Sequence, residues 1–286
     1  MEIMSPNSGE EITSSGTLRE DIDTKMTRDL IKSAKLLSKQ EVRYLVDIYY
    51  TMQDQRIRTA NQVRIMKKAE GEEAEPCEVL EWLFGKSESL EEQIKRALKS
   101  YAESSADGEW AMGVVGIGPV ITAGLLSHID ITKAPTVGHI WSFAGLVPGV
   151  KWEKKQKRPW NAALKRLCWL IGQSFMRNSG RESCVYGKIY RERKVKEVAL
   201  NDAFAFRAQA ETILKEKKID KETDAYKAYI QGKLPPAQIE QRAERYATKL
   251  FIAHLHEVMY KNHFKVDPPK PYPIAILGHA HYIKPA

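Results

Sequence analysis

Residues 113–129 read Gly113-Val-Val-Gly116-Ile-Gly118-Pro119-Val-Ile-Thr-Ala-Gly-Leu-Leu-Ser-His-Ile129, with two glycines one residue apart before a proline and an apolar run. Proline fits the first turn of a helix, so the spacing predicts a helix that begins at Pro119 and ends near Ile129. The glycines allow a tight turn and the close approach of another backbone. The apolar residues expected to line one side of this helix are Val120, Ile121, Ala123, Leu125 and Leu126.

The turn before Pro119 has a pattern that suits a phosphate. Its amides precede a helix N-terminus, where partial positive charge favours an anion. One interpretation is therefore a helix-hairpin-helix that grips nucleic-acid backbone through Gly116, Gly118 and Thr122. The other is a buried turn between two helices with no ligand. A dinucleotide-binding loop is excluded, because Ile121 stands where the third glycine of GxGxxG belongs and no strand pattern precedes it.

Residues 28–105 carry two helical patterns around an acidic turn at residues 71–76. Apolar residues recur three and four apart over 29–68 and again over 77–104, where Gly85-Lys-Ser is expected to break the helix. Two helices across a short turn predict an antiparallel hairpin, here called the arm. We expect residues 29–104 to join two or more copies of the chain as a homodimer or higher oligomer. Residues 1–27, rich in Ser, Glu, Thr and Gly, are expected to form a disordered tail.

Further helices are expected in a domain of residues 106–265. Thr136 is a candidate N-cap for a helix over 137–144, and Trp160-Asn161 opens the next one. Shorter helical patterns follow at 186–196 and 201–219, residues 217–237 are expected to form a peripheral insertion, and 238–264 is strongly periodic. The Pro-rich residues 266–286 should lie extended. No segment alternates as a strand does, so we predict an all-α fold, with the long arm attached to a helical domain that contains the hairpin.

Positive charge is concentrated in residues 151–196, here called the basic segment. The segment has 14 Lys and Arg against 3 Asp and Glu, whereas the whole chain has 45 against 37 and a net charge of +8. A helix face that is only solvated carries both signs interleaved, so this distribution favours nucleic-acid contact. The candidate DNA contacts in the segment are Lys151, Lys154, Lys155, Lys157, Arg158, Asn161, Lys165, Arg166, Arg177, Lys188, Arg191, Arg193 and Lys194.

Four aromatic residues lie among these charges, namely Trp152, Trp160, Tyr186 and Tyr190. Bases stack on such rings in proteins that bind single strands. We expect at least half of the four to pack inside the protein instead.

Other kinds of site find little support in the sequence. The three cysteines form no CxxC pair, which predicts a reduced intracellular compartment. His254 and His256 fall on different faces of one helix, and no carboxylate stands at ligand spacing, so no metal site is expected. The N-terminus lacks the pattern of a secretory signal peptide. No apolar run approaches the roughly 20 residues that a membrane-spanning helix needs. We therefore expect no membrane partner and a cytoplasmic, nucleoid-associated location, and we assign no catalytic residue and no cofactor.

Three ordered blocks carry a likeness to a known family. They are GIGPVITAGLLSHI at 116–129, IWSFAGLVP at 140–148 and KRPWNAALKRL at 157–167. Together they resemble the helix-hairpin-helix-containing C-terminal domain of insertion-sequence 110/116/902 family transposases and of the related Piv-type DNA recombinases. The likeness covers about residues 110–200 and, more weakly, 245–259. It implies DNA binding and a coiled-coil arm, and in the family also a ribonuclease-H-like domain with acidic metal ligands and a serine nucleophile after the second block.

The sequence departs from that family pattern in two places. Its N-terminal region shows only the arm, and residues 149–161 contain no serine. Strand cleavage needs a nucleophile, so we expect a relative that binds DNA backbone, without sequence preference or by recognising structures such as branched DNA, and does not cut it. Two alternatives stay open: an active transposase or site-specific recombinase subunit that needs a partner chain for cleavage, and an RNA-binding accessory protein.

Overall fold

The computed structural model describes residues 25–70, 78–150, 152–153, 155–269 and 285. Every regular element in these ranges is a helix and none is a strand, which confirms the all-α prediction. The elements in chain order are α1 (Arg28–Ser33), the 3₁₀ helix η1 (Ala34–Leu36), α2 (Lys39–Glu70), α3 (Glu78–Ala102), α4 (Ala106–Gly113), α5 (Pro119–His128), the 3₁₀ helix η2 (Ile131–Lys133), α6 (Val137–Phe143), α7 (Ala162–Arg177), α8 (Val185–Asp202), α9 (Arg207–Glu216), α10 (Asp224–Ile230) and α11 (Pro236–Phe264).

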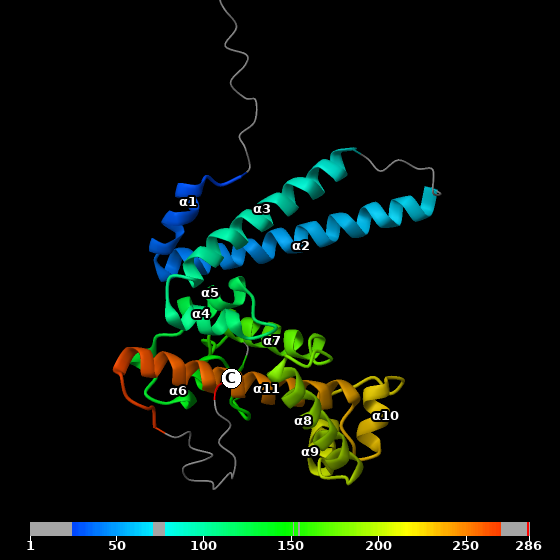
Figure 1. The fold of residues 1–286 in the computed structure, drawn as a ribbon. Coiled ribbons are helices and arrows are strands. Elements are labelled where there is room, and N and C mark those ends of the chain that lie inside the picture. The colour runs from blue at the N-terminus through cyan, green and yellow to red at the C-terminus, as the bar shows by residue number, and fades with distance from the viewer. Residues whose placement is uncertain (1–24, 71–77, 151, 154, 270–284, 286) are drawn as a thin grey trace, which may run out of the picture.

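Helices α2 and α3 pair along the arm, which extends from one side of the molecule (Figure 1). At the base of the arm, Val42 of α2 and Leu98 of α3 are fully buried. They share one hydrophobic cluster with Val120 of α5 and Leu167 of α7. The arm is therefore joined to the rest of the molecule through α5 and α7.

Helix α5 lies between two hydrophobic clusters. Val120 and Ala123 belong to the cluster at the base of the arm, whereas Leu125 and Leu126 belong to the main core. Seven of its ten residues are buried. The predicted helix is confirmed in its bounds, but it is covered on more than the one side expected, because the arm and the main core pack on different faces of it.

The main core is built where α11 packs against α4, α6, α7 and α8. Its centre is aromatic: the rings of Phe175 and Tyr186 stack with centroids 4.9 Å apart, and the ring of Phe251 meets Phe175 edge-on at 5.6 Å. Tyr186 is buried and its hydroxyl satisfies its hydrogen-bonding need at His254 Nδ1, 2.7 Å away. These contacts tie α7, α8 and α11 into one unit.

Helices α9 and α10 form a small lobe at the far end of α8 (Figure 1). The lobe has its own cluster, centred on Ala210, Tyr229 and Leu234. Asn201 of α8 holds the lobe through two hydrogen bonds to Leu234. Asn201 Nδ2 donates to the Leu234 carbonyl at 2.9 Å, and Asn201 Oδ1 accepts from the Leu234 amide at 2.8 Å. The expected insertion at 217–237 thus contains α10.

Three expected helix boundaries are wrong. Residues 29–68 are not one helix, because Ser38 and Glu41 form a capping box that starts α2 afresh: the Ser38 amide donates to Glu41 Oε2 at 2.7 Å and the Glu41 amide to Ser38 Oγ at 3.3 Å. Helix α3 runs unbroken through Gly85, since one glycine costs a helix only about 1 kcal/mol. Helix α8 continues to Asp202, and a turn with Phe204 at φ 57° separates it from α9.

Two N-cap positions agree with the sequence, with one difference in chemistry. Asn161 caps α7 through its Oδ1, which accepts from the Leu164 amide at 2.9 Å. Thr136 precedes α6 as predicted, but its hydroxyl lies 3.0 Å from His139 Nδ1 and caps no amide. The predictions for residues 1–24 of the N-terminal tail and for 270–284 of the C-terminal one lie outside the described residues.

Candidate nucleic-acid interface

The turn between α4 and α5 contains both glycines of the predicted hairpin. Gly116 has a φ of 100°, and a Cβ there would lie 3.2 Å from Ser174 Oγ. Its carbonyl accepts a hydrogen bond from the Ser174 hydroxyl, so Gly116 holds the turn against α7. Gly118 instead occupies the N-cap of α5, has open space where a Cβ would be, and offers no side chain to cap the helix. The first amides of α5 therefore resemble an anion-binding helix start.

A hollow of about 220 Å³ opens at this helix start, here called the hairpin hollow. Residues Gly118–Ile121 line it together with Lys95 from the arm and Arg177 from the end of α7. The Lys95 ammonium already forms an ion pair with Glu92, 3.1 Å away. Arg177, in contrast, is exposed and pairs with no carboxylate in the described part of the chain. Uncapped amides beside two cations are the kind of donor set that binds a phosphate.

The cations of the basic segment fall into two groups. Members of the first are exposed and form no ion pair with any carboxylate that the structure describes. Unpaired positive charge of this kind is available to an external anion, whereas a paired cation must first lose its partner. This first group, here called the unpaired cations, consists of Lys155, Lys157, Arg158, Lys165, Arg166, Arg177, Arg181, Lys188, Arg191 and Lys196.

The second group consists of Arg193 and Lys194, which pair with carboxylates of α8 and α11. Arg193 bonds the buried carboxylate of Glu197, which also accepts from Arg242 Nε at 2.6 Å. Lys194 forms an ion pair with Glu240. Arg193 and Lys194 therefore differ from the unpaired cations, because an external anion must compete with the carboxylate that each already contacts.

The side chains of two further predicted contacts, Thr122 and Asn161, lie inside the protein or bond to its backbone. Thr122 is fully buried, so no DNA can touch it, and its hydroxyl is the buried side-chain polar atom without a hydrogen-bond partner among the described residues. The prediction of Thr122 as a contact is therefore wrong. The side chain of Asn161 is engaged in capping α7. Lys151 and Lys154 lie outside the described residues.

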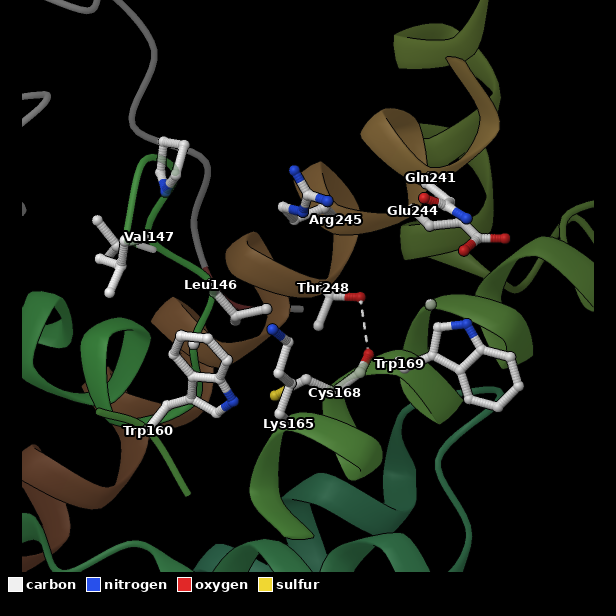
Figure 2. A pocket seen from close by; sticks show the side chains of 14 residues that line it. Leu146, Val147, Trp160, Lys165, Cys168, Trp169, Gln241, Glu244, Arg245 and Thr248 are labelled. Atoms are coloured by element: carbon white, nitrogen blue, oxygen red, sulfur yellow. Dashed lines mark hydrogen bonds between the residues drawn. The ribbon is translucent and has the colours of Figure 1, made fainter. Parts of the chain in front are cut away.

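A second and larger hollow lies between α7 and α11, here called the α7–α11 pocket (Figure 2). Its volume is about 350 Å³, and the loop at 145–150 closes a third side. Figure 2 shows the indoles of Trp160 and Trp169 on opposite sides of it, with Lys165 and Arg245 between them. Beside the pocket the two helices are joined by a hydrogen bond, in which Gln173 Nε2 donates to Oε1 of the lining residue Glu244 at 2.7 Å.

Positive charges crowd this pocket. Burial, together with the nearby charges of Arg245 and Arg158, lowers the pKa of Lys165. Burial and Arg245 likewise lower the pKa of Lys249, whose ammonium lies 4.1 Å from the centroid of the Trp141 ring. Burial raises the pKa of Glu244, the carboxyl group that lines the pocket. Lys165 and Arg245 thus line the pocket together, and Lys249 lies outside its lining.

The four aromatic residues of the basic segment divide as expected. Tyr186 and Tyr190 are buried in the main core. Trp152 is 40% exposed and lies under the guanidinium of Arg158, 4.9 Å from the ring centroid. Trp160 is half-buried, with the Lys165 ammonium 4.1 Å from its ring centroid.

Several residues of these two hollows escaped sequence reasoning. Lys95 lies in an arm with charges of both signs, and Arg245 lies in a helix of mixed charge, so neither stands out by composition. Arg245 reaches the pocket only because α11 packs on α7. Arg181 lines neither hollow but belongs to the unpaired cations, and its place within the basic segment was a signal that could have identified it.

Within the described ranges, no three His, Cys, Asp or Glu side chains gather as a metal site would require. No helix there has the length and apolar character needed to cross a membrane. Comparisons with protein-family models, with curated proteins and with solved structures find no match to this chain.

Proposed function

We propose that the protein binds the phosphate backbone of DNA and does not cleave it. The observation that carries the proposal is the set of unpaired cations at residues 155–196, which are exposed and have no carboxylate partner among the described residues. Arg177 connects these cations to the hairpin, since it is one of the unpaired cations and also lines the hairpin hollow. Phosphate neutralisation by Lys and Arg dominates the affinity of such proteins for DNA.

The arrangement of charge supports this proposal more than net charge does. A structural use of Lys and Arg leaves them beside carboxylates, as Arg193 beside Glu197 illustrates. The unpaired cations have no such partner among the described residues, although they repel one another. Backbone binding explains why the chain keeps them together without compensation.

The resemblance to insertion-sequence transposases is the reason for proposing DNA as the nucleic acid and recombination as the setting. Residues 149–161, where those enzymes place a serine nucleophile, contain no serine. The expected role is therefore to hold DNA, including branched intermediates, rather than to cut it. Incubation with Mg²⁺ and supercoiled DNA should leave the DNA intact. A nicked or protein-linked product would contradict this part of the proposal and favour the recombinase alternative.

Charge reversal in the loop before α7 tests the binding site directly. Changing Lys155, Lys157 and Arg158 together to Glu should weaken binding to duplex DNA by about tenfold or more, because three phosphate contacts turn repulsive. The loss should be the same for unrelated sequences, since phosphates carry no sequence information. Fluorescence anisotropy with two unrelated duplexes measures it.

A matched control is available in the arm. Changing Lys32, Arg58 and Lys99 to Glu alters net charge by the same amount, but each of these residues already lies beside a carboxylate. The control should lose little affinity. Equal losses in the two triple variants would contradict a localised interface, and no loss in either would contradict DNA backbone binding through this loop.

The proposal includes self-association through the arm. Beyond its base, the arm exposes large apolar side chains, among them Ile65 (57% exposed) on α2 and Trp82 (62% exposed) on α3. Apolar area left in water favours association of copies. Sedimentation velocity at micromolar protein should show a dimer or larger species, and the I65E/W82E variant should shift it toward monomer. A monomeric wild-type protein would refute self-association through the arm.

A further inference from the structure

The α7–α11 pocket combines features that the binding of a continuous duplex backbone does not use. A phosphate needs only surface cations, whereas this hollow of about 350 Å³ has an interior. Its volume falls within the roughly 300–1,000 Å³ typical of sites for small organic groups. Leu146 and Cys168 supply an apolar floor and two indoles supply walls.

The charged and polar groups of the pocket have a distinct arrangement. Lys165 and Arg245 stand between the two indoles, and neither forms an ion pair with a described residue (Figure 2). Glu244 lies deeper, is 4% exposed, and accepts from Gln173 through one oxygen. The pocket thus offers cations at its middle, a hydrogen-bonding carboxyl group at one side, and aromatic faces at both ends.

We propose that this pocket binds a single unpaired nucleotide of a DNA strand, with the phosphate on Lys165 and Arg245 and the base against Trp169. This inference rests on the proposed backbone binding and adds a substrate class to it: DNA that carries an unpaired base at a bulge, flap or branch. A base in a duplex keeps its faces stacked on its neighbours, so only an unpaired one can place a face on an indole.

Trp169 is the indole positioned for this role. It is 55% exposed, whereas Trp160 is half-buried and already carries the Lys165 ammonium close to its ring. Trp169 also lines the same hollow as Lys165 and Arg245, so a base stacked on its exposed ring would keep its phosphate within reach of both cations. The hydrogen-bonding edge of the base would then face Gln241 and Glu244, which line the same side of the pocket as Trp169 (Figure 2).

A pair of duplexes separates this inference from the proposed function. One is fully paired, and the other has the same sequence with a single-nucleotide bulge that carries 2-aminopurine. The full-length wild-type protein should bind the bulged duplex about 5-fold or more tightly than the paired one, as expected for one stacked base. Binding should also change the 2-aminopurine fluorescence, and an abasic bulge should lose the preference.

Three alanine variants make the test specific. Trp169→Ala and Arg245→Ala should remove the preference for the bulge, while Trp169→Ala leaves affinity for the paired duplex unchanged. Trp152→Ala, an exposed tryptophan outside the pocket lining, should keep the preference. A wild-type protein that binds both duplexes equally overturns the pocket inference and leaves backbone binding standing. A protein that binds neither overturns both.

The remaining outcomes concern the source of the nucleotide. A free deoxynucleoside monophosphate that competes as well as the bulged strand would assign the pocket to a soluble nucleotide and overturn the DNA version. Single-stranded RNA that binds more tightly than DNA of the same sequence, with the same loss in Trp169→Ala, would overturn it in favour of RNA.

Discussion

Single glycines decide how closely the elements pack, and the sequence indicated only some of them. Gly116 and Gly118 stood out because they precede a proline in a turn. Gly124, inside α5, carried no such signal. Its importance comes from tertiary contact: a Cβ there would lie 2.7 Å from Leu167 Cδ1 of α7. Sequence reasoning could place α5 but could not identify the helix that crosses it at Gly124.

Substitution of Gly124 by alanine should therefore destabilise the protein. The added methyl group forces the buried side chain of Leu167 to shift, and overpacking of this kind costs about 1–3 kcal/mol. Chemical denaturation of the purified protein measures the change in the free energy of unfolding. Gly85→Ala is the matched control, because a Cβ there meets nothing within 4 Å. It should stabilise α3 by about 0.5–1 kcal/mol, and a destabilised G85A or an unaffected G124A would contradict this packing.

Whole helices show where charge serves structure instead of binding. The first two thirds of α8 are rich in Lys and Arg, and this composition predicted DNA contacts at Lys188, Arg191, Arg193 and Lys194. In the structure Arg193 pairs with Glu197 of α8 itself, and Arg242 of α11 binds the same carboxylate. Lys194 pairs with Glu240 of α11. The spacing of four between Arg193 and Glu197 is visible in the sequence, but Lys188 and Glu192 share it. The pairing of Lys194 depends on which face of α8 meets Glu240 of α11.

The junction of α8 and α11 should make stability depend on pH. Burial raises the pKa of Glu197, but hydrogen bonds from Arg242 and Arg193 outweigh burial and lower it below the ordinary 4.5. A lowered carboxylate pKa contributes stability that is fully present above 4.5 and is lost as pH falls through the folded-state value. Glu197→Gln should thus cost about 3 kcal/mol at neutral pH, and the cost should shrink as pH falls below 4.5.

Denaturant titrations of wild type and E197Q between neutral pH and pH 3 measure this difference. Glu103→Gln is the control, since its partner Lys99 and Glu103 itself are both exposed. That variant should change stability by less than about 1 kcal/mol at any pH. A cost for E197Q that stays constant down to pH 3 would show that Glu197 does not act as a paired carboxylate.

At the scale of the whole molecule, the sequence predicted the helical class, the arm and the concentration of charge. These follow from local periodicity and composition, which do not require knowledge of the fold. The two hollows could not be predicted in the same way. The hairpin hollow needs the arm to bring Lys95 to α5, and the α7–α11 pocket needs Arg245 to pack near Lys165. Contacts between helices this far apart in the chain leave no pattern in one sequence.

Backbone binding by the unpaired cations is the central claim, and its salt dependence tests it most directly. The affinity for a paired duplex should be measured by anisotropy from 50 to 200 mM salt, with wild type and the Lys155/Lys157/Arg158→Glu variant. The logarithm of the association constant should fall linearly with the logarithm of salt, by about 0.9 per phosphate contacted, and the triple variant should show a shallower slope. Affinity that does not change with salt, or equal slopes for the two proteins, would contradict the claim.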